Sequence, residues 1–178
     1  MRQSVKISAL VLIVILLAAG CDNRDFVVEK QQLILFQFDY HNDTQHTGYI
    51  LDSEGNVFTY NNPENWNFPD KDYEISQEQV AENEGKCVFS GRKIPGDELT
   101  KYTKYIDFMA LSKVTAPRNT NADEGITQYI CYQFSESTQT YKGCLIKTEG
   151  NVTRENLNFH SKRVSSWMKD ISNGISFE

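Results

Sequence analysis

Four side chains that can bind zinc lie within eight residues of one polar segment, FDYHNDTQH. They are Asp39, His41, Asp43 and His46. Imidazole and carboxylate groups are zinc ligands, and three of them with one water make a catalytic site. The spacing here lacks the one-face geometry that a helix gives to H-E-x-x-H, and these residue types are also common in ordinary connections. We therefore expect splayed, exposed histidines and no bound metal. The alternative is a small hydrolase or metal-dependent enzyme that uses the Asp39–His46 loop.

Aromatic side chains accompany a second polar segment, NNPENWNFPDKDY. They are Tyr60, Trp66, Phe68 and Tyr73. Rings among amides can stack on sugars, which makes these four the candidate ligand-binding residues. The alternative is that a long loop packs its aromatic side chains over the edge of a sheet, as a satellite of the core.

Three cysteines follow Cys21, and two of them stand at matching positions of a predicted hairpin. Cys131 and Cys144 fall opposite each other if the turn centres between residues 137 and 138. Opposed residues approach to about 4.5–5.5 Å, which is close to disulfide range. The sequence predicts a possible disulfide between them, with two buried thiols as the alternative. Cys87 competes for either partner, or remains a buried structural thiol.

Sequence motifs for other catalytic classes are missing. The chain contains no glycine-rich phosphate loop, no G-x-S-x-G elbow and no S-x-x-K, and no carboxylate pair has a spacing that assigns acid and base roles. The sequence therefore predicts no catalytic residue and no cofactor. Formal net charge is −6, and an acidic surface repels phosphate backbones, so nucleic-acid binding is disfavoured.

The chain begins with a basic and then apolar segment, MRQSVKISALVLIVILLAAGCDN. Arg2 and Lys6 precede an apolar run from residue 7 to 19, which is too short for a transmembrane helix of about 20 residues but suits a signal peptide. Small residues then lead into Cys21.

This segment resembles the lipobox of bacterial lipoproteins, although Ala18 replaces the commoner leucine. The resemblance implies cleavage before Cys21 and lipid attachment to that cysteine. It places the protein in the bacterial cell envelope, with its folded part outside the cytoplasm. Asp22 leaves inner and outer membrane both open. We expect a signal peptide over residues 1–20 and a lipid-attached tether over 21–31.

Residues 32–178 carry the patterns of one α+β domain. Strands are expected at 33–38, 47–52 and 57–60, with Gly55 in a turn, and they form a three-stranded antiparallel meander. Residues 126–134 and 140–148 form a second hairpin. Helices are expected after Ser76, from Asp97 to Leu111, and over 164–171. We predict an antiparallel sheet built from the meander and the hairpin, with about three helices on one face.

The stretches GYILDSEGNVFTY, ELTKYTKYID and ENLNFHSKRVSSWMKDI are similar to small uncharacterised lipoproteins of Bacteroides-type bacteria. This resemblance implies a fold and a compartment. The sequence as a whole favours a membrane-anchored, non-enzymatic module that binds a protein or glycan.

Overall fold

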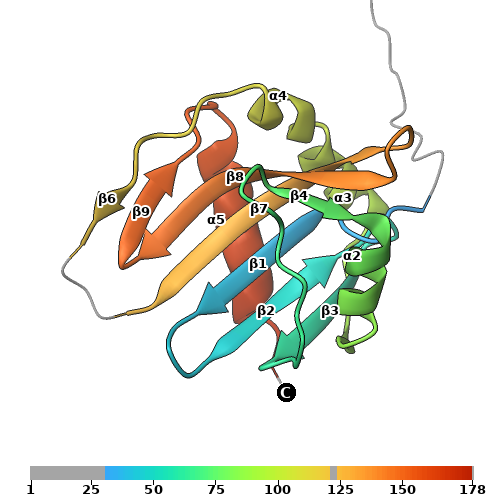
Figure 1. The fold of residues 1–178 in the computed structure, drawn as a ribbon. Coiled ribbons are helices and arrows are strands. Elements are labelled where there is room, and N and C mark those ends of the chain that lie inside the picture. Colours follow the sequence, from blue (N-terminus) through green and yellow to red (C-terminus); the bar gives the residue numbers. More distant parts are fainter. Residues whose placement is uncertain (1–30, 121–123, 178) are drawn as a thin grey trace, which may run out of the picture.

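The computed structural model of the chain describes residues 31–120 and 124–177, which form an α+β domain around an antiparallel sheet (Figure 1). The predicted signal peptide, Cys21 and almost all of the predicted tether lie outside the described residues.

The predicted meander is present at the centre of the sheet. Its strands are β1 (Phe36–His41), β2 (His46–Leu51) and β3 (Asn56–Asn61). β1 pairs with β2, and β2 with β3, both antiparallel. Gly55 takes the left-handed conformation, with φ of 85°, as the predicted turn requires.

The predicted second hairpin is also present, and it joins the meander directly. It consists of β7 (Ile126–Ser135) and β8 (Thr140–Gly150). β7 lies antiparallel to β1, so the two predicted pieces form one continuous sheet. Cys131 stands opposite Cys144 as predicted. Both thiols are free in the structure, so the disulfide stays a prediction.

Four further strands extend the sheet beyond the predicted ones. They are β4 (Glu74–Ser76), β5 (Val88–Lys93), β6 (Arg118–Asn119) and β9 (Val152–Glu155). The strand order is β5-β3-β2-β1-β7-β8-β9-β6, with β4 paired to β8. Neither edge strand is both long and regularly paired. β6 has two residues, and the ladder between β5 and β3 is interrupted by a register shift.

Helices cover both faces of the sheet. They are α2 (Gln77–Glu84), α3 (Gly96–Thr103), α4 (Ile106–Ala110) and α5 (Ser161–Asn173). The capping box of α2 is as predicted, since Ser76 Oγ accepts from Gln79 N at 3.2 Å and Gln79 Oε1 accepts from Ser76 N at 3.1 Å. The single helix predicted from Asp97 to Leu111 is instead two helices, α3 and α4. The break at Tyr105 places that ring 3.8 Å from the ring of His160.

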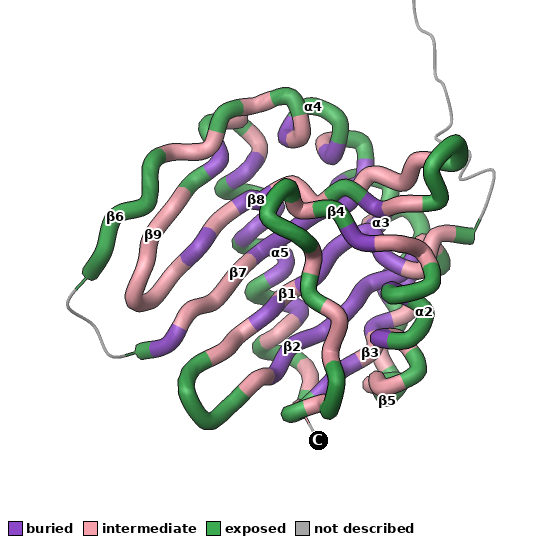
Figure 2. The backbone as a smooth tube through the Cα atoms, viewed as in Figure 1, coloured by how far each residue is buried: buried purple, intermediate pink, exposed green. Residues whose placement is uncertain are grey.

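Two hydrophobic clusters hold the layers together, and Figure 2 shows the buried residues running along the central strands. One cluster joins the sheet to α3, α4 and α5, which correspond to two of the three predicted helices, and includes Trp167, which stacks on Tyr102 at 4.1 Å. The other joins the opposite face to α2 and β4, through Val80 and Ile75, so the helix predicted after Ser76 does not share the face of the other helices. Each face therefore has its own packed core.

Among the described residues, no helix is long and apolar enough to cross a membrane.

Candidate functional site

The turn between β1 and β2 brings the predicted zinc-binding segment back on itself. Asn42 Oδ1 accepts hydrogen bonds from the backbone N–H groups of Thr44 at 2.9 Å and Gln45 at 2.8 Å, which closes a tight turn. His41 and His46 are consequently the last paired residues of the two strands. Because side chains of opposed residues share a face, both imidazoles lie on the side of the sheet that also carries Asp39.

Asp39 is the centre of the site. Its Oδ1 lies 2.6 Å from the hydroxyl of Tyr60 and 2.7 Å from His46 Nε2, and its Oδ2 lies 3.1 Å from His41 Nδ1. The residue is 4% exposed. A carboxylate accepts only, so the tyrosine and both imidazoles donate to it. Three donors from three strands therefore satisfy one buried charge.

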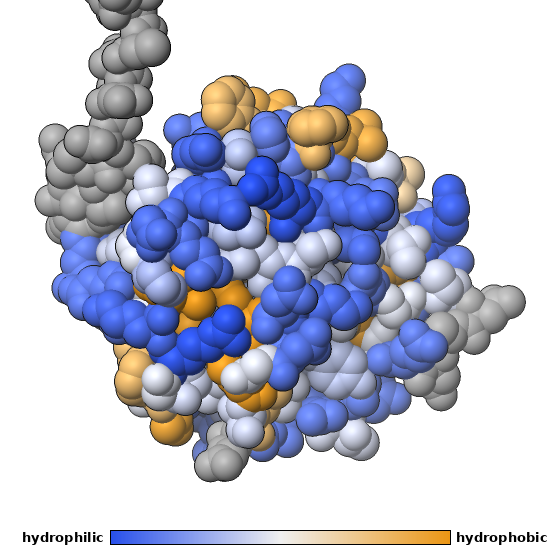
Figure 3. Space-filling view, turned by 180° about the vertical axis from the view of Figure 1, so that it is seen from behind, coloured by the Kyte–Doolittle hydropathy of each residue, from blue (hydrophilic) through white to orange (hydrophobic). Residues whose placement is uncertain are grey.

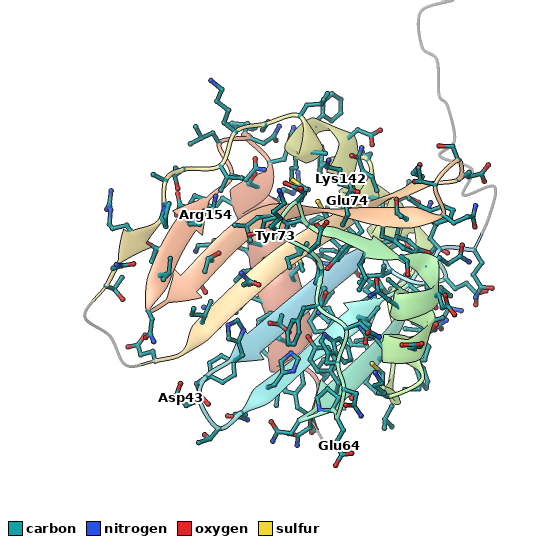
Figure 4. All side chains as sticks on the ribbon, viewed as in Figure 1. Asp43, Glu64, Tyr73, Glu74, Lys142 and Arg154 are labelled. Atoms are coloured by element: carbon teal, nitrogen blue, oxygen red, sulfur yellow. The ribbon has the colours of Figure 1, made fainter. Side chains whose placement is uncertain are left out.

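The histidines differ from their expected splayed arrangement. Both rings turn to the same carboxylate, and the side chain of His46 is only 16% exposed, against 39% for His41. The physical reason is the pairing of the two strands, which leaves no loop long enough for the rings to diverge. Asp43 lies at the tip of the hairpin, away from this group (Figure 4). In the described parts of the chain, no group of three or more histidine, cysteine or acidic residues is arranged to hold a metal ion.

Hydrogen bonding controls the electrostatics of this buried group. Burial alone raises the pKa of Asp39, but the bonds from His41, His46 and Tyr60 outweigh burial and lower that pKa to about 2. The bond to Asp39 raises the pKa of His41. Burial, reinforced by the charge of Asp39, raises the pKa of Tyr60 well above its ordinary value. The site at neutral pH is therefore a carboxylate facing a neutral phenol and two imidazoles.

The network continues from Tyr60 across the sheet. Gln37 Nε2 donates to the Tyr60 hydroxyl at 3.1 Å, and the hydroxyl of Tyr132 donates to Gln37 Oε1 at 2.7 Å. Gly48 lies beside the hydroxyl of Tyr60. A Cβ on residue 48 would come within 2.3 Å of that hydroxyl oxygen and of the carbonyl oxygen of Phe38. Only glycine leaves room there for the ring of Tyr60 to reach Asp39. The result is a line of hydrogen bonds running from β7 to β3 through the core.

Three of the four predicted ligand-binding aromatics surround His46. Its ring lies 5.2 Å from Tyr60, 5.6 Å from Trp66 and 5.4 Å from Phe68. Tyr60 is buried and Trp66 is half-buried, whereas Phe68 is 63% exposed. Tyr73 lies apart, beside Glu74 and Lys142 (Figure 4). The four rings therefore form no common exposed platform, and Tyr60, Trp66 and Phe68 pack around the histidine.

His41 borders a cavity next to the Asp39 group. The cavity has a volume of about 370 Å³. Its lining is His41, Asn42, Asp43, Thr44, Gly125, Ile126 and Asn151. Since His41 Nδ1 donates to Asp39, a neutral ring carries its lone pair on Nε2. This arrangement can accept a proton, which is the first requirement of a general base.

The remaining predicted thiol is a structural one. Cys87 is half-buried, its Sγ donates to the carbonyl oxygen of Asn83 at 3.2 Å, and burial raises its pKa to about 12. A thiol with that pKa is protonated at neutral pH and is a poor nucleophile.

Comparisons with protein-family models, curated proteins and solved structures find no match to this chain. The family resemblances inferred from the sequence therefore stay predictions.

Replacing Asp39 with asparagine tests the charge at the centre of the site. The folded-state pKa lies below the ordinary value, so ionised Asp39 stabilises the fold above about pH 4 and this contribution is lost as the pH falls toward 2. We expect Asp39→Asn to be the less stable protein at pH 5. The difference in unfolding free energy from wild type should shrink by about 2 kcal/mol between pH 5 and pH 2, measured by denaturant titration. If the same pH-dependent difference in unfolding free energy appeared for Asp43→Asn, the effect would come from net charge and not from the hydrogen bonds to Asp39.

Proposed function

We propose that this protein is a lipoprotein of the bacterial cell envelope, anchored through Cys21, whose domain binds a partner outside the cytoplasm without catalysing a reaction. The observation that carries the binding role is a group of large apolar side chains exposed at one end of the molecule. They are Phe108 (60% exposed), Leu111 (88%), Leu157 (66%) and Phe159 (93%), and we call them the α4 surface. Several large apolar side chains exposed on neighbouring segments are typical of interaction sites.

Two hydrogen bonds join the two segments that carry the α4 surface. The backbone N–H of Leu157 donates to the carbonyl oxygen of Lys113 at 2.9 Å, and Asn158 Nδ2 donates to the carbonyl oxygen of Phe108 at 3.1 Å. These bonds hold the segment before α5 against the end of α4. In Figure 3 the two segments stand out as two apolar groups at the top of the molecule.

The chemistry of the Asp39 group supports binding over catalysis. Both oxygens of Asp39 are occupied by donors of the chain itself, and the surrounding rings pack over His46. A buried polar group that is fully satisfied stabilises and orders a fold. We therefore assign Asp39, His46 and Tyr60 a structural role in this proposal.

Cys21→Ala tests the anchor. Without the thiol no lipid can be attached, so the variant should fail to incorporate labelled fatty acid and should accumulate as precursor or as a product that leaves the detergent phase. Cys87→Ala is the matched control and should be labelled like wild type, because Cys87 lies inside the domain. Full partition of processed Cys21→Ala into the detergent phase would contradict the lipoprotein assignment.

A photo-crosslinking residue at Leu111 tests the binding surface. In native membranes we expect adducts from position 111 and none from position 64, since Glu64 is exposed at the opposite end of the domain (Figure 4). Mass spectrometry of the products gives the measurement. Equal labelling from both positions, or none from either, would contradict a binding role for the α4 surface.

A second candidate function follows from His41, whose imidazole is oriented by Asp39 and borders the cavity of about 370 Å³. This candidate is a small hydrolase or metal-dependent enzyme. Elemental analysis of the purified chain separates the two functions, and we expect no stoichiometric zinc because the Asp39 oxygens are already bonded to protein donors. One zinc per chain that is lost in His41→Ala and kept in Asp43→Ala would favour the enzyme.

A further inference from the structure

Basic side chains surround the α4 surface. They are Lys101, Lys104, Lys113, Lys162 and Arg163, all exposed. The acidic side chains nearby are Asp97, Glu98, Asp107 and Glu155; Glu98 Oε1 accepts from Trp167 Nε1 at 2.6 Å, and Asp107 Oδ1 accepts from Gln133 Nε2 at 2.7 Å. Five cations against four carboxylates leave this end slightly positive, whereas the chain as a whole has 24 acidic and 18 basic residues.

These five cations are available for an external anion. Within residues 31–120 and 124–177, none of them forms an ion pair with a carboxylate. Lys104 Nζ lies 5.1 Å from the ring centre of Tyr105, and Arg163 Cζ lies 5.9 Å from that of Tyr102, so these two charged groups lie over aromatic rings. All five side chains are exposed and can still reach an anion at the surface.

A buried asparagine fixes the backbone beneath the α4 surface. Asn156 Nδ2 donates to the carbonyl oxygen of Met109 at 2.9 Å, and Asn156 Oδ1 accepts from Asn158 N at 2.9 Å and from Ser161 Oγ at 3.1 Å. One side chain thus ties α4 to the start of α5. The protruding phenylalanines and leucines are held by this scaffold before any partner arrives, which lowers the entropic cost of binding.

A cavity of about 350 Å³ lies next to the apolar side chains. Its lining includes Leu157 of the α4 surface, Lys162 and Glu155. Lys147 also lines it and forms an ion pair with Glu149, so Lys162 is the cation that the cavity leaves unpaired. Apolar side chains and an unpaired cation therefore occur side by side.

We propose that the α4 surface is a docking surface for an anionic lipid bilayer. Phe108, Leu111, Leu157 and Phe159 would enter the boundary between headgroups and acyl chains, and the five cations would contact headgroup phosphates. Apolar insertion combined with positive charge is the physical basis of interfacial membrane binding. The inference deepens the proposed function, since it names the partner of the same surface.

The length of the predicted tether agrees with this occupant. An extended chain from Cys21 to Gln32 spans at most about 40 Å, so a lipid on Cys21 keeps the domain close to a bilayer. At such an effective concentration, even a weak surface contact is populated. Docking through the α4 surface would then fix the orientation of the domain on the bilayer.

The test uses the mature chain from residue 21 with Cys21→Ser, so that no lipid contributes and the result is independent of the anchor. The probes are vesicles of phosphatidylcholine alone and of phosphatidylcholine with an equal part of phosphatidylglycerol. We expect co-sedimentation with the anionic vesicles, weakened by 0.5 M salt because screening shortens the reach of exposed charges. Phe108→Ser with Phe159→Ser should weaken binding by about tenfold or more, from the lost burial of two phenyl rings.

Two matched controls separate this surface from general effects. Phe89→Ser removes a half-exposed phenyl ring from β5 and should leave binding unchanged. Lys113→Glu with Lys162→Glu should weaken binding to anionic vesicles, whereas Lys71→Glu with Lys93→Glu makes the same change of charge elsewhere and should have a much smaller effect. Circular dichroism and thermal unfolding verify that all variants fold, as expected for exposed positions.

Three outcomes would overturn the docking proposal. Absence of binding to either vesicle, with position 111 still crosslinking in native membranes, would assign the α4 surface to a protein partner. Equal binding to neutral vesicles, insensitive to the charge changes, would remove the role of the cations. A dimer in solution that Phe108→Ser with Phe159→Ser abolishes would assign the surface to a second copy of the chain.

Discussion

The arrangement of this domain depends on satisfying one buried carboxylate. Asp39 is in the middle of the central strand, where an unpaired charge would cost several kcal/mol. Its three donors come from β1, β2 and β3, so the meander must keep one register for the charge to be satisfied. A slip of one residue would turn His46 to the other face and leave Asp39 short of a donor.

This constraint reaches beyond the three strands. Tyr60 can approach Asp39 only because residue 48 has no side chain, and Gln37 and Tyr132 carry the same network to β7. The rings that cover His46 then exclude water from the carboxylate. The hydrogen bonds inside the sheet and the aromatic packing over His46 therefore depend on each other. Together they order the face of the sheet opposite α3, α4 and α5.

Local patterns predicted the elements whose signals are contiguous in the sequence. The meander, the β7–β8 hairpin, the capping box at Ser76 and the closing helix follow from alternation, turn residues and helical spacing. The convergence of His41 and His46 on Asp39 was missed, because it depends on strand register and on a tyrosine 21 positions further along the chain. The α4 surface was missed for the same reason. Tyr105 and Phe108 widen the apolar stripe of the helix predicted from Asp97 to Leu111, and the sequence does not show that this helix breaks and leaves Phe108 and Leu111 exposed.

The two edges of the sheet have a consequence for how copies of the chain meet. One edge ends in the two-residue strand β6, and the other ends in β5, whose pairing with β3 is interrupted and which carries Gly91 at φ of 77°. Open edges are the places where sheets of separate molecules join into larger aggregates. Here neither edge offers a long, regular row of free backbone groups. Crowded copies of this protein would therefore find little template for strand-to-strand growth.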